Sequence, residues 1–310
     1  MPRPFRKYQR DAFKVADKAF QGAQHIVSVL ECQDYSSSWQ SKYYSAIVAA
    51  DGHGDRKCFR SALGSRYAGE AVKECVHSFM KEKMSCLEKP WILYFSEEEI
   101  KDLILKIVRT WREKVLIDLL GRPLEKDARY EKLMEYQKEA LGKNKFKAYG
   151  TTLLVGVMTK TSYFLLQLGD GSICVEGADH NAVEASKQFE GLRREMYMNN
   201  IADVTESMSS SNAELAFRYH FVNTEGKTRL PKWIFVTTDG LFKMYDGEIE
   251  PSLELVETIT DYYSKGMEQE VVEKIDKYIN DLAAKVRGGT GTDDISYALI
   301  CTKAGEPRKR

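Results

Sequence analysis

The hydrophobic and polar positions of the first half of the chain follow a helical repeat in two long stretches. Apolar residues recur every three to four positions between residues 60 and 84, which predicts an amphipathic helix that covers a sheet. A second helix is predicted to begin at the capping-box sequence Ser96–Glu99 and to end at Gly121–Pro123. Its buried stripe is expected to consist of Ile100, Leu103, Ile104, Ile107, Val108 and Trp111.

From residue 150 onward, the pattern changes to short apolar runs separated by glycines and polar turns, as in antiparallel strands. Residues 151–158 and 162–168 predict a hairpin that turns at Thr159–Thr161. Because the apolar positions of these runs are nearly continuous, we expect this sheet to be buried on one face by another sheet and on the other by helices. A further helical pattern covers residues 253–282.

Two segments give weaker patterns. The stretch of about residues 85–147 is charged and helical, and its part after residue 123 is expected to be helical only in places, with a solvated surface rather than a binding role. The stretch of about residues 178–231 lies between two apolar runs that carry acidic residues. From that position, it would lie over a site formed by those acidic residues and would select substrates. Within it, the polar run Ser207–Asn212 predicts a mobile loop or a helix-cap region.

Composition narrows the classes of protein to consider. The 310 residues are 43% hydrophobic, enough for one large core, and we expect a single domain over residues 1–310. The 46 basic residues equal the 46 acidic ones, so there is no overall field that would attract nucleic acid or an anionic membrane. The chain lacks an apolar run of ~18 to 20 residues, its start lacks the apolar centre of a signal peptide, and its six cysteines form no Cys-x-x-Cys pair. We therefore expect a cytoplasmic protein with reduced thiols.

Acidic residues recur where the apolar runs end or begin. Asp51 follows the run 46–50, Asp239 and Asp170 end two later runs, and Asp34 follows the apolar run His25–Leu30. The pair Asp293–Asp294 directly precedes the strand-like residues 295–300. Since Asp-Gly is also the commonest turn dipeptide, any one of these acids is equally typical of a plain turn. If they converged, however, they would repel one another without a cation, and carboxylate ligands suit Mg²⁺ or Mn²⁺ rather than zinc.

The order of these motifs resembles the metal-dependent serine/threonine protein phosphatases of type 2C, and most closely their bacterial branch. The resemblance runs from about residue 22 to residue 302 and rests on Cys32–Asp34, Asp51–Gly54, Gly150–Leu154, Gly169–Gly171, Thr238–Leu241 and Thr292–Ser296. It implies an α+β fold, a four-layer αββα sandwich in which two antiparallel sheets are flanked by helices. It also implies a catalytic domain that hydrolyses phosphoserine and phosphothreonine in proteins by means of a water bridging two Mn²⁺ or Mg²⁺ ions. The expected partner is a phosphorylated protein that a serine/threonine kinase has modified.

The resemblance assigns roles to particular residues. It implies that Asp51 bridges both ions, that the Gly52 carbonyl binds one of them, and that Asp239 and Asp293 complete the shell of one ion. Asp34 would hold the second ion, directly or through water. The remaining assignments are Asp170 as a ligand of a third ion or else a turn acid, Asp294 as a support of the ligands, and His53 as the proton donor to the leaving oxygen.

One departure from the family pattern leaves alternatives open. Many members carry an arginine that grips the substrate phosphate five residues before the first aspartate, and here that position is Val29. Phosphate binding would then rest on the metal ions, on His25, or on a basic residue that the sequence does not identify. The missing arginine supports one alternative function, a catalytically weak, metal-binding regulatory module of the same fold. A phosphatase of small phosphate esters would share all the proposed ligands, so the sequence does not separate it from a protein phosphatase.

Overall fold

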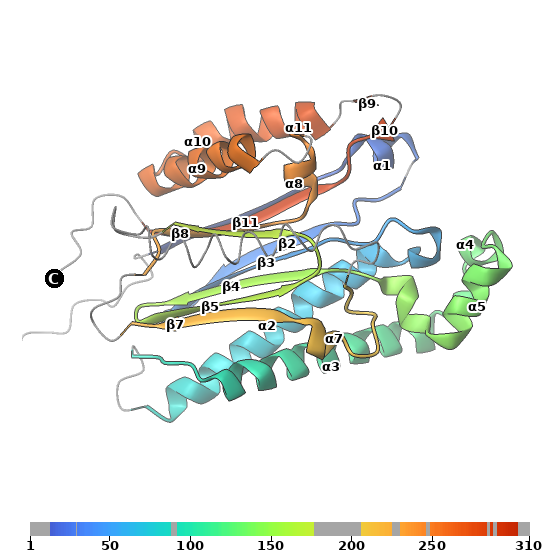
Figure 1. Cartoon of the computed structure of the whole chain (residues 1–310), viewed down its shortest axis with the longest axis horizontal. Helices are drawn as coiled ribbons and strands as arrows, with labels where there is room; N and C mark the ends of the chain where they lie inside the picture. The colour runs from blue at the N-terminus through green and yellow to red at the C-terminus, as the bar shows by residue number, and fades with distance from the viewer. Residues whose placement is uncertain are drawn as a thin grey trace, which may run out of the picture.

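The computed structural model describes residues 13–28, 30–87, 92–176, 206–224, 230–245, 249–283, 286–287 and 290–302. Two antiparallel sheets are stacked in the middle of the molecule, and helices cover the outer face of each (Figure 1). This is the four-layer α+β sandwich that the family resemblance implied. None of the helices in the described ranges is both long and apolar enough to cross a membrane.

The larger sheet contains five strands in the order β2-β3-β4-β5-β7, with every neighbouring pair antiparallel. Its strands are β2 (Tyr35–Gln40), β3 (Tyr44–Ala50), β4 (Leu153–Thr159), β5 (Ser162–Leu168) and β7 (Arg218–Asn223). The predicted hairpin of residues 151–158 and 162–168 is confirmed as β4 and β5. Every residue of β3, β4 and β5 is buried, which explains why their apolar runs are nearly continuous.

The smaller sheet contains four antiparallel strands in the order β1-β11-β8-β6. Its strands are β1 (Phe13–Phe20), β6 (Ser172–Glu176), β8 (Trp233–Thr237) and β11 (Ile295–Thr302). A separate two-stranded ribbon, β9 (Val286–Arg287) with β10 (Thr290–Gly291), lies beside the short helix α1 (Ala23–Val27) at one end of the sandwich (Figure 1).

The two sheets meet in an apolar layer of their own. Ile47 and Leu154 from the larger sheet are packed with Ile234 and Ile300 from the smaller one. Gly156 of β4 allows this close approach, because a Cβ atom at that position would lie 2.9 Å from Ile234 Cγ2. The strand ends that carry the acidic residues are thereby held in fixed positions relative to one another.

Two long helices cover the outer face of the larger sheet, as predicted. They are α2 (Ser61–Ser85) and α3 (Glu97–Gly121), and both begin within one or two residues of the expected positions. The predicted capping box is present at the start of α3, where the Ser96 hydroxyl accepts from the Glu99 amide and the Glu99 carboxylate accepts from the Ser96 amide. The whole predicted stripe of α3, from Ile100 to Trp111, is buried.

Helices also cover the outer face of the smaller sheet. They come from the stretch in which the sequence predicts a helical pattern over residues 253–282. In the structure this stretch is broken into α9 (Ile249–Lys265), α10 (Glu268–Glu270), the π-helical turn η5 (Val271–Asp276) and α11 (Lys277–Ala283). Gly266 adopts a φ of 81° after the first helix, a conformation that ends the helix and that glycine accommodates without strain.

The charged segment that follows α3 folds into short helical turns, in agreement with the prediction of partial helicity. The turns are η2 (Leu124–Lys126), α4 (Ala128–Glu131), α5 (Glu135–Lys143) and η3 (Lys145–Tyr149), and η1 (Arg56–Cys58) lies close to the last two.

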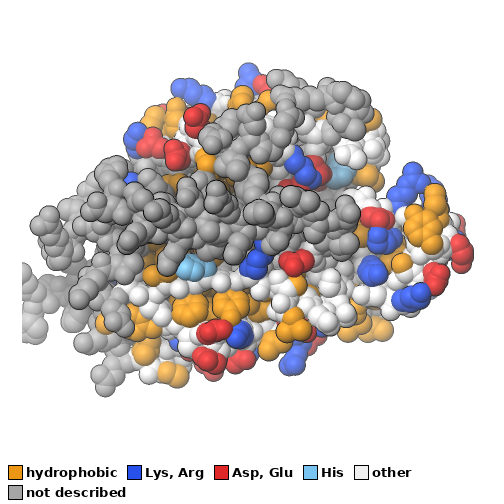
Figure 2. All heavy atoms as spheres, viewed as in Figure 1, with side chains coloured by type: hydrophobic (Ala, Val, Ile, Leu, Met, Phe, Trp, Pro, Cys, Tyr) orange, Lys and Arg blue, Asp and Glu red, His pale blue; other side chains and the backbone are white. Residues whose placement is uncertain are grey.

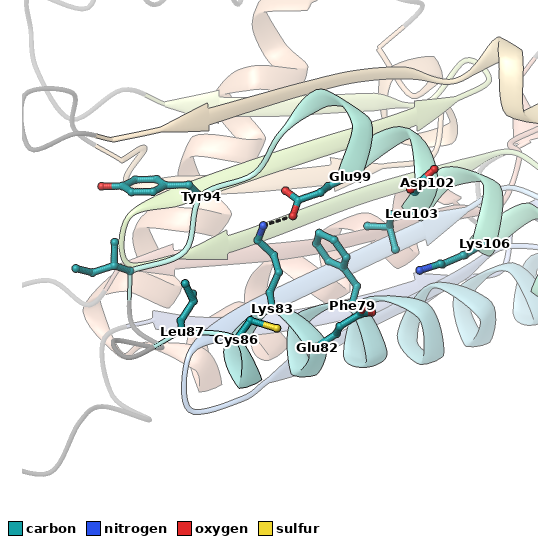
Figure 3. Close-up of a pocket in the computed structure, with 11 residues that line it drawn as sticks. Phe79, Glu82, Lys83, Cys86, Leu87, Tyr94, Glu99, Asp102, Leu103 and Lys106 are labelled. Atoms are coloured by element: carbon teal, nitrogen blue, oxygen red, sulfur yellow. Dashed lines mark hydrogen bonds and ion pairs between the residues drawn. The ribbon is translucent and has the colours of Figure 1, made fainter.

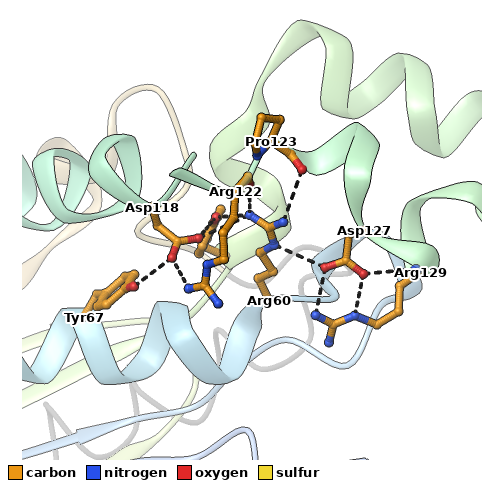
Figure 4. Close-up of polar contacts among 8 residues, drawn as sticks. Arg60, Tyr67, Asp118, Arg122, Pro123, Asp127 and Arg129 are labelled. Atoms are coloured by element: carbon orange, nitrogen blue, oxygen red, sulfur yellow. Dashed lines mark hydrogen bonds and ion pairs between the residues drawn. The ribbon is translucent and has the colours of Figure 1, made fainter. Parts of the chain in front are cut away.

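A buried polar network joins this segment to the start of α2 (Figure 4). The Arg60 guanidinium donates to the Tyr149 hydroxyl at 2.6 Å, to Asp118 Oδ2 at 3.2 Å and to the Arg122 carbonyl at 2.6 Å. Asp118 also accepts from the hydroxyls of Tyr67 and Tyr149. Because Tyr149 lies just before β4, the network fixes the entry into the strand that pairs with β3.

The apolar run before Asp34 begins in α1, and Asp34 directly precedes β2. Of the two alternatives for the run 207–212, the structure favours the helix-cap region over the mobile loop, because Ser207, Met208 and Ser209 are buried and the Met208 amide donates to the Thr151 carbonyl at 2.9 Å. The one-turn helix α7 (Ala213–Ala216) follows directly, with Asn212 at its N-terminus but without a side-chain cap.

The segment at about residues 178–231 is described only in part, since residues 177–205 and 225–229 lie outside the described ranges. Its described part includes β7, the edge strand of the larger sheet. Its substrate-facing role and the single domain over residues 1–310 both stay predictions.

Candidate metal centre

Three acidic side chains from three different strand ends converge between the sheets. Asp51 directly follows β3, Asp170 lies in the turn between β5 and β6, and Asp239 lies between β8 and the one-turn helix α8 (Gly240–Lys243). Each offers a carboxylate oxygen, and the three oxygens lie within 4.8 Å of one another. Residues far apart in the sequence therefore form one carboxylate group with the donor chemistry that Mg²⁺ and Mn²⁺ prefer.

Asp51 is held by its backbone, while its carboxylate has no hydrogen-bond donor in the described ranges. Its amide donates to Thr152 Oγ1 at 3.0 Å, and its carbonyl accepts from the Thr152 amide at 2.9 Å and from Thr151 Oγ1 at 2.8 Å. Burial, followed by the charges of Asp34 and Asp239, raises the pKa of Asp51 well above its usual range. A partly buried carboxylate with these neighbours is stabilised by a bound cation.

Asp34 lies beside this group rather than within it. Its Oδ2 accepts a hydrogen bond from Thr238 Oγ1 at 2.6 Å, so a residue next to Asp239 fixes its orientation. Burial raises the pKa of Asp34 to about 8, against the lowering effect of that hydrogen bond. Asp34 is thus a second buried acid whose ionised form is disfavoured unless positive charge is nearby.

Gly52 allows the segment that carries Asp34 to approach Asp51. A Cβ atom on Gly52 would lie 2.6 Å from the Gln33 carbonyl oxygen and 3.0 Å from the Ser61 Cβ. No side chain fits there, which gives a structural reason for glycine at this position beside the carbonyl role that the resemblance implies.

Lys243 is the residue of this region that the sequence reasoning missed. Its Nζ lies 2.6 Å from Asp239 Oδ2 and 3.2 Å from Asp293 Oδ2. Burial raises the pKa of Asp239 to about 6, and the charge of Lys243 opposes that rise. The i, i+4 spacing of Asp239 and Lys243 was a sequence signal for this pair, but it requires knowing that a helix begins at Gly240.

Asp294 is buried and fully engaged with protein groups. Its Oδ1 accepts from the Gly22 amide at 2.7 Å, and its Oδ2 accepts from the Gln33 amide at 2.6 Å and lies 2.7 Å from His25 Nδ1. Burial opposes ionisation, but the contacts with His25, Gly22 and Gln33 outweigh it and lower the pKa of Asp294. This carboxylate therefore ties the segments before and after α1 to the start of β11.

His25 faces this same carboxylate and is 5% exposed. The hydrogen bond to Asp294 raises the pKa of His25, although burial acts in the opposite direction. Its role in phosphate binding stays a prediction, and the position of the missing arginine, Val29, lies outside the described residues.

His53 lies beside the carboxylate group with its ring against Gly150. Its backbone amide donates to the Gly150 carbonyl at 3.0 Å, and its Nε2 is buried without a hydrogen-bond partner among the described residues. Burial lowers the pKa of His53, and the charge of Asp170 partly opposes this effect. The imidazole is therefore neutral at pH 7 in the absence of a further negative charge.

A separate hollow of about 370 Å³ lies between the end of α2 and the start of α3. Phe79, Lys83, Tyr94, Glu99 and Lys106 are among its lining residues, and Lys83 forms an ion pair with Glu99 across it (Figure 3). Its carboxylates are not clustered as those of the metal centre are.

On the described surface of one face of the molecule, basic and acidic side chains are interspersed, in keeping with the zero net charge (Figure 2).

The sequence model of the family Protein phosphatase 2C matches residues 21–283. The chain therefore belongs to the protein phosphatase 2C family, whose members are metal-dependent serine/threonine phosphatases. The resemblance that the motifs indicated is confirmed, and the chain is an enzyme of this class. No match was found among curated proteins.

Solved structures similar to the chain include bacterial phosphatases. A serine/threonine phosphatase of S. agalactiae is 17% identical with a TM-score of 0.49, over 94% of this chain and 100% of that one. A bacterial serine phosphatase is 12% identical with a TM-score of 0.50, over 95% and 100%. The catalytic domain of the phosphatase PstP in complex with two manganese ions is 10% identical with a TM-score of 0.48, over 94% and 99%. At these identities, the likeness to the bacterial serine phosphatase shows the fold alone.

Proposed function

We propose that the chain removes phosphate from phosphoserine and phosphothreonine residues of proteins, with two Mn²⁺ or Mg²⁺ ions as cofactors. The observation that carries this proposal is the convergence of Asp51, Asp170 and Asp239, with carboxylate oxygens within 4.8 Å of one another, in a member of a phosphatase family. When bound, the two ions would supply an activated water for attack on phosphorus and would neutralise the phosphate oxygens.

The residues around this group fit a binuclear site. Asp51 is the best candidate to contact both ions, because its carboxylate has no hydrogen-bond donor in the described ranges and lies among other acids. We assign the Gly52 carbonyl to one ion, Asp239 and Asp293 to one shell, and Asp34 to the second. The proximity of Asp170 to Asp51 and Asp239 favours a ligand role, at a third ion, over a plain turn.

His53 is proposed as the proton donor to the leaving serine or threonine oxygen. Its buried Nε2 is not engaged by protein groups in the described ranges, so this nitrogen is available to a substrate oxygen. Because burial holds the imidazole neutral, the negative charge of the bound phosphate would be needed to raise its pKa and keep the proton on it. Protonation of a poor leaving group contributes on the order of 10² to 10⁴ in rate.

The expected substrate is a phosphorylated cytoplasmic protein, with a serine/threonine kinase as the opposing activity. A catalytically weak regulatory module is the second candidate, and two observations favour it. Val29 stands where many relatives carry the phosphate-binding arginine. In addition, the ammonium of Lys243 already pairs with two of the proposed ligands.

A comparison of substrates tests the proposal. The chelator-stripped chain is assayed with phosphothreonine peptides, phosphoserine peptides and small phosphate esters, each with Mn²⁺, with Mg²⁺ and without metal. We expect metal-dependent turnover of the peptides with higher kcat/KM than for the small esters. Metal binding without turnover would support the regulatory module, whereas preference for small esters would assign the enzyme to that substrate class.

A further inference from the structure

Lys243 is carried into the acidic region by a short, fixed turn of helix. Its amide donates to the Asp239 carbonyl at 2.9 Å, which places the two side chains one helical turn apart on the same face. The turn is held against the chain next to Asp293, because a Cβ atom on Gly240 would lie only 2.0 Å from the Asp294 carbonyl oxygen. Leu241 is fully buried beside it. The starting point of the Lys243 side chain is therefore fixed by packing.

The ammonium contacts two of the carboxylates that are assigned to the metal ions. It lies 2.6 Å from Asp239 Oδ2 and 3.2 Å from Asp293 Oδ2. The other oxygen of Asp293, Oδ1, accepts from the Asp294 amide at 3.0 Å, so both oxygens of this carboxylate are engaged. A divalent ion bound by Asp239 and Asp293 would lie close to this ammonium, so the two cations would compete for the same pair of carboxylates.

The exposure of Lys243 makes this exchange feasible. Its side chain is 56% exposed, whereas that of Asp239 is 13% exposed, so the long aliphatic stem can move toward solvent while the acid stays in place. The ammonium neutralises part of the repulsion among the carboxylates when no ion is bound. It also repels an incoming dication at short range.

We propose that Lys243 is a placeholder cation of the metal centre: its ammonium holds Asp239 and Asp293 together in the metal-free protein and competes with the divalent ion for them. Lys243 is thus a positioning residue that sets metal affinity. The inference rests on the proposed metal centre, and it adds that this chain binds its metal more weakly than its carboxylates alone would.

Replacing the ammonium with an apolar side chain of similar length tests the competition. We expect Lys243→Met to bind Mn²⁺ at least tenfold more tightly in calorimetric titration and to lose Mn²⁺-free thermal stability by a few °C. Both changes follow from removing one positive charge close to two carboxylates. Lys243→Arg keeps the charge and should bind Mn²⁺ with nearly the wild-type affinity.

A matched control is available on α9. Lys265 pairs with Asp261 at the same i, i+4 spacing and at 2.7 Å, and its side chain is 55% exposed. Lys265→Met should therefore leave Mn²⁺ affinity unchanged and change the melting temperature little. If Lys243→Met fails to fold without metal, all variants are purified with Mn²⁺, and affinity is compared by chelator competition.

The outcomes separate this inference from the proposed function. Equal or weaker Mn²⁺ affinity in Lys243→Met, with clear binding by the wild type, would overturn the placeholder role and leave the metal centre intact. Absence of Mn²⁺ binding by the wild type would remove the metal centre itself, and the role of Lys243 with it. Tighter binding in both Lys243→Met and Lys243→Arg would show that shape rather than charge matters, which also contradicts the inference.

Discussion

The carboxylates of Asp118 and Asp51 differ in what surrounds them. Asp118 accepts hydrogen bonds from Tyr67, Tyr149 and the arginines at 60 and 122 (Figure 4). Burial acts to raise its pKa, but the bonds from Tyr149 and Arg122 prevail and lower it. The carboxylate of Asp51 has no such donor in the described ranges, and burial raises its pKa well above the usual range.

The comparison separates acids that are hydrogen-bonded within the fold from acids whose charge is compensated only when a ligand binds. A buried carboxylate with several donors is satisfied by the fold and stabilises it, whereas one that faces other carboxylates costs stability until a cation arrives. Substitution of Asp51 should therefore lower activity without lowering the stability of the metal-free protein, whereas substitution of Asp118 should lower stability and leave the metal site unchanged.

The largest expected effect is that of Asp51→Asn on activity. We expect turnover of p-nitrophenyl phosphate to fall at least about 10³-fold and Mn²⁺ binding to weaken, because the carboxylate at the centre of the acidic group loses its charge. The melting temperature of the metal-free variant should equal or exceed that of the wild type, since a source of repulsion is removed.

Asp261→Asn serves as the control for this substitution, because Asp261 pairs only with an exposed lysine on α9 among the described residues. It should change neither turnover nor Mn²⁺ affinity. Retention of full activity by Asp51→Asn would contradict the assignment of this residue as a ligand.

The second largest expected effect is that of His53→Gln on the hydrolysis of a substrate with a poor leaving group. We expect His53→Gln to reduce phosphoserine-peptide hydrolysis about 10²-fold, with a much smaller loss on p-nitrophenyl phosphate, whose leaving group needs no proton. The measurement is kcat/KM for both substrates at saturating Mn²⁺. Equal losses would place His53 in packing against Gly150, and unchanged rates would make it an ordinary loop residue.

Asp118→Asn should mainly lower stability. We expect a loss of about 2 kcal/mol in the free energy of unfolding, measured by urea denaturation, because Arg60 would lose a buried charged partner and keep only the longer ion pair with Asp127 Oδ2 at 3.4 Å. The Mn²⁺ affinity of the folded fraction should stay unchanged. A loss of Mn²⁺ binding without a loss of stability would contradict the division between the two groups.

The smallest expected effect is a pH dependence at Asp127. Hydrogen bonding to Arg129 lowers the pKa of this carboxyl to about 2, below the value of 3.8 of the unfolded chain. Its contribution of about 1 to 2 kcal/mol is therefore fully present above pH 4 to 5 and is lost as the pH falls toward 2. Asp127→Asn should be less stable than the wild type at pH 7, and the difference should disappear near pH 2.

Much of the fold could be predicted where local patterns and tertiary packing agree. The repeat of apolar residues and the Ser96–Glu99 capping box gave α2 and α3 to within one or two residues. The apolar residues before Asp34 do not mark a buried element, because Ile26 and Val27 are 52% and 75% exposed on a short helix. The polar run at 207–212 is partly buried because the Ser207 hydroxyl bonds to the Thr151 carbonyl, just before β4, and to the Ser209 hydroxyl, contacts that a local pattern does not report.

The candidate site could be predicted in its parts but not in its arrangement. Motif order led to Asp51, Asp170 and Asp239, and these three do converge. The bond between Thr238 and Asp34 joins residues 204 positions apart, so no local pattern reports it. The pairing of Lys243 with Asp293 likewise depends on how α8 packs against the start of β11.

The central claim is that the acidic group between the sheets holds the metal ions on which phosphatase activity depends. Its most direct test is one titration of Mn²⁺ into the chelator-stripped chain, with bound Mn²⁺ followed by electron paramagnetic resonance and hydrolysis of p-nitrophenyl phosphate followed in the same samples. Binding and activity should rise together in the wild type, and both should be lost in Asp51→Asn but kept in Asp261→Asn. Full hydrolysis in the stripped wild type, or Mn²⁺ binding that is unchanged in Asp51→Asn, would contradict the account.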